Sequence, residues 1–175
     1  YGTFALGLVV AGNSPYKTVE DFTQFVRTNP HKMKQASTGA GTTGHLALEL
    51  FKIKGRGLKI DMVPFKTTFE MRTAVLGGHT QSAFLYGGGG GPNDEFTQMI
   101  ESGGRLLAVT TPERLPAYPN VPTLKEKGID AVFSSWYGIA GPKGMPPETS
   151  SVLKTAVYNA LEKPEVKAAI ERLGF

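Results

Sequence analysis

Glycines, hydroxyl groups and a histidine gather in residues 37–45, which read Ser-Thr-Gly-Ala-Gly-Thr-Thr-Gly-His. A strand pattern ends at Ser37, and apolar residues recur at helical spacing from Leu46 until Gly55. Glycines let a ligand approach the backbone closely. The first N–H groups of a helix have no partner inside it, and the helix dipole favours an anion there. The stretch therefore predicts a cradle for a carboxylate or phosphate, formed by Ser37, Thr38, Gly39, Gly41, Thr42, Thr43 and His45.

Two other interpretations of this loop remain open. Gly39-x-Gly41-x-x-Gly44 matches the dinucleotide-binding fingerprint, which would make the chain an NAD(P)-binding oxidoreductase domain. That fingerprint needs an acidic residue at the end of the next strand, whereas Asp61 lies inside the pattern of residues 59–65. Alternatively, the glycines form only a tight turn and Thr42 caps the helix. For His45, the sequence allows a ligand contact, a bystander or a general base.

The surrounding sequence predicts the elements that hold this loop. Strand patterns cover residues 4–11, 33–37, 59–65, 80–86, 105–111 and 132–140, and helical patterns begin near residues 18, 42, 69 and 96. This alternation indicates an α/β fold with a mostly parallel sheet covered by helices. Ligands of such folds bind beyond the carboxyl ends of the strands. Phe65, Lys66 and Tyr86 stand at two further strand ends and join the predicted site, although Phe65 could be a core aromatic and Lys66 a solvated charge.

The pattern of alternating elements breaks after the strand pattern of residues 105–111, and an unusual glycine run precedes that break. Residues 87–91 are five consecutive glycines, which predict a mobile loop without a packed role of its own. Residues 111–122 contain four prolines and predict an irregular segment. Two amphipathic helical patterns, at about residues 150–161 and 164–173, close the chain.

Composition excludes several classes of function. The chain has 175 residues, of which 40% are hydrophobic and 19% charged, and it contains 0 Cys, so we expect a globular core without disulfides or thiolate metal sites. Its net charge of +4 comes from scattered Lys and Arg, which argues against nucleic-acid binding. No apolar run is long enough to insert into a membrane. Because hydrolase, phosphate-loop and metalloprotease motifs are missing, we expect no enzyme activity, metal or cofactor.

Several stretches together resemble one family, the extracytoplasmic Bug-type receptors of tripartite tricarboxylate transporters. The matching stretches are residues 37–46, 63–66, 76–78, 107–110, 114–123, 135–138 and 141–146, in the order and spacing of the family. The resemblance implies a type II periplasmic-binding-protein fold, in which two lobes close on a ligand. It also implies a periplasmic receptor that captures a small organic acid (a di- or tricarboxylate or an aromatic carboxylate) and passes it to the transporter's membrane components.

The resemblance further implies a division into lobes. Residues 12–130 would form the second ligand-binding lobe. Residues 1–11 and 131–175 would supply hinge strands and the C-terminal part of the first lobe, whose N-terminal half is absent. The start at Tyr1, without Met, also suggests a processed or truncated chain.

The sequence departs from the family at two positions of interest. Phe65 stands where the family usually has tyrosine, which removes one hydroxyl contact. Gln81 stands where the family usually has an acidic residue that could meet an amino group, which argues against an amino-acid ligand. A third hypothesis for the chain is an interaction module that uses the proline-rich residues 112–122 as its docking surface.

Overall fold

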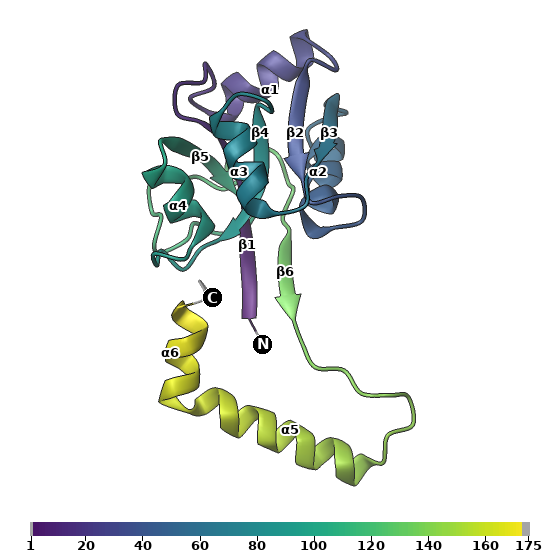
Figure 1. Cartoon of the computed structure of the whole chain (residues 1–175). Helices are drawn as coiled ribbons and strands as arrows, with labels where there is room; N and C mark the ends of the chain where they lie inside the picture. The colour runs from purple at the N-terminus through teal and green to yellow at the C-terminus, as the bar shows by residue number, and fades with distance from the viewer. Residues whose placement is uncertain (1, 173–175) are drawn as a thin grey trace.

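The computed structural model describes residues 2–172. Its elements alternate along most of the chain, and Figure 1 shows their arrangement. In order they are β1 (Gly2–Ala11), α1 (Val19–Thr28), β2 (Met33–Ser37), α2 (Thr43–Lys54), β3 (Ile60–Pro64), α3 (Thr68–Leu76), β4 (Ser82–Gly87), α4 (Glu95–Glu101), β5 (Gly104–Val109), β6 (Ser134–Tyr137), α5 (Pro147–Glu162) and α6 (Pro164–Arg172). The predicted element types are confirmed, but the last strand covers only four of the nine residues expected.

The sheet has the order β3-β2-β4-β1-β5, and β6 pairs with the outer part of β1. Strands β3, β2 and β4 run parallel, as predicted. Strand β1 lies in the middle and runs antiparallel to β4, β5 and β6. The sheet is therefore mixed, and β1 is its one reversed member, because β1 enters from the edge at which β2, β3 and β4 end.

Helices cover both faces of the sheet and bury an apolar core on each. On one face, α1 and α2 pack against β1 and β4 through side chains such as Phe22, Phe51 and Phe84. On the other face, α3 and α4 pack through Met71 and Phe96. Strand β1 contributes to both cores, which explains its uninterrupted apolar sequence. This packing holds the ends of β2, β3 and β4 in fixed positions along one edge.

The glycine run is not the unpacked loop that the sequence predicted. Gly87 is the last residue of β4 and is buried, and a Cβ atom there would lie 2.6 Å from Phe96 Cγ. The backbone N–H groups of Gly88, Gly89 and Gly90 all donate hydrogen bonds to Asp94. Glycine is required at Gly87 and Gly90, where a Cβ atom would lie 2.6 Å from Phe96 and 2.7 Å from Ala117.

The proline-rich segment also differs from one hypothesis. It is irregular, as predicted, but Leu115, Tyr118 and Val121 pack against the core on the α3 and α4 face. Arg114 forms an ion pair with Glu126 at 2.7 Å and holds the segment at a second point. The segment is thus packed against the sheet and its covering helices, and its apolar side chains are not free to serve as a docking surface.

The outer part of β1 and strand β6 extend side by side beyond the helices that cover the sheet, and α5 and α6 lie apart from the sheet (Figure 1). Helix α5 buries none of its residues, and Val152, Leu153 and Tyr158 are all at least half exposed. Among the described helices, none is both long and apolar enough to cross a membrane. The predicted end of the last helix, at residues 173–174, lies outside the described residues.

Candidate functional site

The candidate residues converge on the edge at which β2, β3 and β4 end. The N–H of Phe65, just after β3, donates to the carbonyl of Ser37, the last residue of β2, at 2.8 Å. The N-terminus of α2 lies over β2 and β4, because a Cβ atom on Gly44 would be 3.5 Å from Ser37 Oγ and 3.7 Å from the carbonyl of Phe84. Residues from three strands and one helix are therefore neighbours at this edge.

The glycine loop keeps an open backbone. Gly39 and Gly41 adopt φ angles of 117° and 79°, and no atom lies within 4 Å of the position a Cβ would take at either residue. These backbone conformations are ones that only glycine adopts readily. The loop is therefore held in a shape that leaves free space above it.

Hydrogen bonds within the loop engage two of its hydroxyl groups. Thr42 donates to the carbonyl of Gly39 at 2.8 Å. The hydroxyl of Ser37 lies 3.4 Å from that of Thr42, and Ser37 is only 1% exposed. Because the Thr42 hydroxyl already donates its proton to the Gly39 carbonyl, the Ser37 hydroxyl is the donor to Thr42. Both hydroxyl protons thus stabilise the loop from beneath.

His45 also acts on the loop. The N–H of Gly41 donates to Nδ1 of His45 at 3.0 Å, so Nδ1 is the acceptor and any ring proton of the neutral form resides on Nε2. Nε2 lies 3.7 Å from Glu49, whose carboxylate pairs with Lys52 at 2.6 Å. His45 therefore links the loop to the first turns of α2.

Helix α2 differs from α1, α3 and α4 in its N-terminal cap. The side chains of Thr18, Thr67 and Asp94 cap α1, α3 and α4. No side chain caps α2, because the Thr42 hydroxyl turns back to Gly39. The N–H groups of Thr43 and Gly44 have no intrahelical acceptor at these first positions. In the described part of the chain, no hydrogen bond engages the hydroxyls of Thr38 and Thr43 either.

The remaining candidates share the edge but not one face of the sheet. Tyr86 packs with the core on the α1 and α2 face, and its ring lies edge-on to Phe4 with centroids 6.3 Å apart. Phe65 packs on the opposite face, against the core beneath α3 and α4. Lys66 is exposed, and its backbone N–H donates to Glu70 at 2.9 Å. Tyr86 is therefore on the α2 side of the edge, while Phe65 and Lys66 flank α3.

Comparison with known proteins identifies the family. The sequence profile of the TctC family, described as "Tripartite tricarboxylate transporter family receptor", matches residues 2–175. The chain belongs to the TctC receptor family. A Cupriavidus necator relative, "UPF0065 protein in gbd 5'region", is 32% identical over 97% of this chain and 50% of its own length. "Protein BugT" of Bordetella pertussis is 28% identical over 97% of this chain and 59% of its own length.

Solved structures of TctC proteins share the fold. "R. palustris Rpa4515 with adipate" superposes with a TM-score of 0.79 at 26% identity and covers 98% of this chain and 56% of that one. A "TctC solute binding protein from Polaromonas", solved with no ligand, gives a TM-score of 0.77 at 26% identity and covers 98% and 58%. The α/β fold implied by the resemblance is confirmed. The chain spans about half the length of these relatives.

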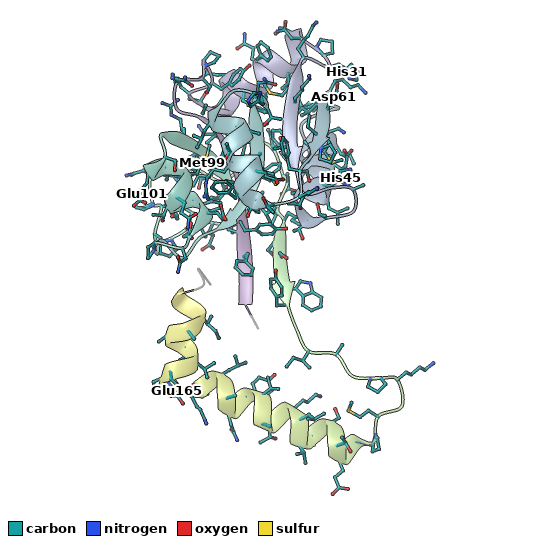
Figure 2. The ribbon with its side chains drawn as sticks, viewed as in Figure 1. His31, His45, Asp61, Met99, Glu101 and Glu165 are labelled. Atoms are coloured by element: carbon teal, nitrogen blue, oxygen red, sulfur yellow. The ribbon has the colours of Figure 1, made fainter. Side chains whose placement is uncertain are left out.

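The dinucleotide interpretation has no support in this TctC chain. Asp61 lies near the start of β3, at the opposite edge from the glycine loop, and it pairs with His31 at 2.9 Å. Figure 2 shows His31 and Asp61 together, far from His45. Phe65 and Lys66 directly follow the end of β3, so the acidic residue that would bind a ribose hydroxyl at that position is not there.

Gln81 does not lie at the candidate site, so the inference against an amino-acid ligand is wrong. Gln81 precedes β4 and therefore lies at the edge opposite the candidate site. It exchanges hydrogen bonds with the backbone of Lys34 at 2.9 Å in each direction. Gln81 therefore carries no information about an amino group on the ligand.

Sequence reasoning missed Asp94, which lies beyond the end of β4. Its carboxylate is 1% exposed and accepts hydrogen bonds from glycine N–H groups and from the hydroxyl of Tyr118 at 3.0 Å. Burial and the neighbouring negative charge of Asp94 raise the pKa of Tyr118 to about 12. The signal available in the sequence was an aspartate just before an apolar helical pattern, typical of an N-cap. Among the described residues, no group of three or more acidic or histidine side chains could hold a metal ion.

Proposed function

We propose that this chain forms one ligand-binding lobe of a periplasmic solute receptor and that the lobe holds a carboxylate of a small organic acid at the N-terminus of α2. The observation that carries this proposal is the missing side-chain cap of α2 at the edge where β2, β3 and β4 end. A carboxylate at such a position accepts hydrogen bonds from the free N–H groups and interacts favourably with the helix dipole.

The contacts divide the candidate residues into two roles. The backbone N–H groups of Thr43 and Gly44 and the hydroxyls of Thr38 and Thr43 would bind the carboxylate. Ser37, Thr42 and His45 would shape the loop, because their polar atoms already bond to other loop atoms. Gly39 and Gly41 would keep the approach open. Tyr86 would line the pocket on the α2 side, with Phe65 and Lys66 beyond it.

The division into lobes remains part of this proposal. Residues 12–130 would be the second lobe, and β1 and β6, which leave it side by side, would form the hinge. Helices α5 and α6 would belong to the first lobe. An apolar groove of about 690 Å³, lined by residues including Trp136, Leu153 and Tyr158, supports this arrangement, because it offers a surface for packing against the rest of that lobe.

The proposed ligand is an organic acid rather than a nucleotide. A relative at 26% identity was solved with adipate, a dicarboxylate. We propose that the acid is delivered to the membrane components of a tripartite transporter, and that the chain itself is not an enzyme and needs no cofactor. The choice among dicarboxylates, tricarboxylates and aromatic carboxylates is a matter for a binding screen.

A thermal-shift screen tests the proposal directly, because a ligand that binds only the folded chain raises its unfolding temperature. The screen compares adipate, citrate and benzoate with NADH and NADPH, and each acid is matched by sodium chloride of equal ionic strength. We expect at least one carboxylate to raise the midpoint above its salt control, and neither nucleotide to do so. Stabilisation by a nucleotide and by no carboxylate would overturn the proposal.

A further inference from the structure

The carboxylate of Asp94 occupies a ring of donors at the end of β4. Oδ2 accepts hydrogen bonds from the N–H groups of Gly88, Gly89 and Gly90 at 2.6, 2.8 and 3.2 Å. Oδ1 accepts from the N–H groups of Phe96 and Thr97 at 2.8 and 3.3 Å and from the hydroxyl of Tyr118 at 3.0 Å. An ordinary N-cap bonds only to the first turn of its own helix, so Asp94 does more than cap α4.

The Gly88–Gly90 segment forms a concave anion-binding turn, and Asp94 is its anion. Successive N–H groups that point toward one centre create such a concavity. Gly88 and Gly90 have φ angles of 130° and 71°, which side chains rarely tolerate. No described cation forms an ion pair with Asp94, so backbone N–H groups and one phenol satisfy this buried charge. We call Gly88–Gly90 and Asp94 the β4 nest.

The nest is braced by a segment distant in sequence. A Cβ atom on Gly88 would lie 3.4 Å from Leu115, and the side chain of Tyr118 reaches both Asp94 and the hydroxyl of Thr97, the latter at 2.7 Å. Arg114 binds Glu126 through two nitrogens and fixes the start of this segment. The conformation of the glycine turn is therefore set by tertiary contacts.

The nest also adjoins the candidate site and the point at which β1 and β6 begin to pair with each other. Gly87 follows Tyr86 and pairs with Ala5 of β1. Ala5 in turn pairs with Ser134, where β6 begins. A change in the nest would therefore be transmitted to Tyr86 on one side and to β1 and β6 on the other.

We propose that Asp94 is a positioning residue whose carboxylate fills the β4 nest, so that a bound acid finds its free backbone donors in this lobe only at α2. The second half of this inference rests on the proposed function. Without Asp94 the nest would be an empty carboxylate site beside the α2 site. The nest and the α2 site would then compete for the carboxylate of the ligand.

Chemical rescue with formate tests this inference, because formate is a carboxylate without a side chain. Four proteins are compared by thermal unfolding in sodium formate and in sodium chloride of equal ionic strength: the natural chain, Asp94→Ala, Thr43→Pro and the double variant. We expect Asp94→Ala to lower the midpoint by roughly 5 °C or more. Formate should then raise the unfolding midpoint of Asp94→Ala by several degrees. It should do the same for the double variant, which lacks the Thr43 N–H at the start of α2.

The outcomes separate this inference from the proposed function. The inference is overturned if formate raises the unfolding midpoint of the double variant no more than chloride does, or if Asp94→Ala stays unfolded in formate. Either result would mean that the nest does not select a carboxylate. If Thr43→Pro leaves acid binding unchanged while formate still rescues the double variant, the proposed function fails and the nest stands. Asp61→Ala, which removes an exposed carboxylate, is the control, and formate should not raise its unfolding midpoint above the value in chloride.

Hydrogen exchange on the natural chain gives a second test that needs no variant. We expect the N–H groups of Gly88, Gly89 and Gly90 to exchange at least roughly 100-fold more slowly than an unstructured glycine, because each one donates to a buried carboxylate. Exchange at the unstructured rate would overturn the inference. The exposed Gly144, whose N–H donates no hydrogen bond within the described part of the chain, is the internal reference.

Discussion

The hydroxyl of Ser37 lies 3.4 Å from that of Thr42, which itself donates to the carbonyl of Gly39 at 2.8 Å. This relay lies beneath the glycine loop, since Ser37 is buried. Its two protons are committed inside the protein, so the loop hydroxyls do not form one uniform set of ligand donors. The free donors are instead those of the helix start at Thr43.

Ser37→Ala and Thr42→Ala should therefore act mainly on stability. Each removes a hydroxyl bonded inside the loop, and we expect each to lower the free energy of unfolding by about 1 kcal/mol. Affinity of the folded chain for the acid found in the screen should change less than roughly threefold. Urea unfolding and calorimetric titration measure the two effects. A loss of affinity of tenfold or more without a loss of stability would show that these hydroxyls contact the ligand.

Gly87→Ala tests the packing of the glycine run. The new methyl group would lie 2.6 Å from Phe96 Cγ and 2.7 Å from Asp94 Oδ1, so either the helix or the carboxylate must move. Such overpacking costs about 1–3 kcal/mol, and more where backbone bonds are lost. Gly57→Ala is the matched control, because it adds a methyl to open space at a φ of 76° and should cost only about 1 kcal/mol. If Gly87→Ala and Gly57→Ala lose equal free energy of unfolding in urea, the glycine run is not packed.

The sequence predicted the elements well because their signals are local. The capping box of Thr18 and Asp21 and the stop at Gly55 are short-range features, and both are present in the structure. The edge shared by the ends of β2, β3 and β4 followed from parallel pairing, which was also correct. The reversed direction of β1 was not predicted, because an apolar run buried on both faces does not reveal its direction.

The candidate residues share one edge of the sheet, as the sequence predicted, but the hydrogen bonds within the loop differ from those expected. A threonine before a helix looks like a cap, yet the Thr42 hydroxyl bonds to Gly39 instead. Composition made the glycine run look mobile, because its partner, Asp94, is held by Tyr118 from a separate segment. Such tertiary contacts depend on packing, and no local pattern encodes them.

The raised pKa of Tyr118 predicts a specific loss of stability at high pH. Its pKa is raised from 10.0 to about 12 in the folded chain, first by burial and also by the charge of Asp94. Between these values the unfolded chain releases the phenolic proton while the folded chain keeps it, so the free energy of unfolding falls as pH rises. Tyr118→Phe should show a shallower decline across this interval in urea unfolding. Parallel declines in both proteins would contradict the raised pKa.

Helix α5 should contribute little to the stability of the sheet and the helices that cover it. Leu153 is 50% exposed, and α5 buries no residue, so Leu153→Ser should change the free energy of unfolding by less than about 0.5 kcal/mol. Leu48, which is 0% exposed in the core beneath α2, gives the contrast, because Leu48→Ala should cost about 2–5 kcal/mol. A loss above 1 kcal/mol for Leu153→Ser, measured by urea unfolding, would mean that α5 packs against the sheet and its covering helices.

The central claim is that backbone donors at the start of α2 bind a carboxylate, and Thr43→Pro isolates one of them. Proline is favoured at the first position of a helix, and Thr42 already has the extended backbone that precedes proline, with φ −74° and ψ 163°. Thr43→Ala removes only the hydroxyl, so the difference between the two variants reports the N–H. Thr68→Pro makes the same change at the capped start of α3.

Calorimetric titration of these three variants with the acid found in the screen is the decisive measurement. A hydrogen bond to a charged group contributes about 1.5–3 kcal/mol, so Thr43→Pro should bind roughly 10- to 100-fold more weakly than Thr43→Ala. Thr68→Pro should bind as the natural chain does. Equal affinities of Thr43→Pro and Thr43→Ala, with both proteins folded, would contradict the claim.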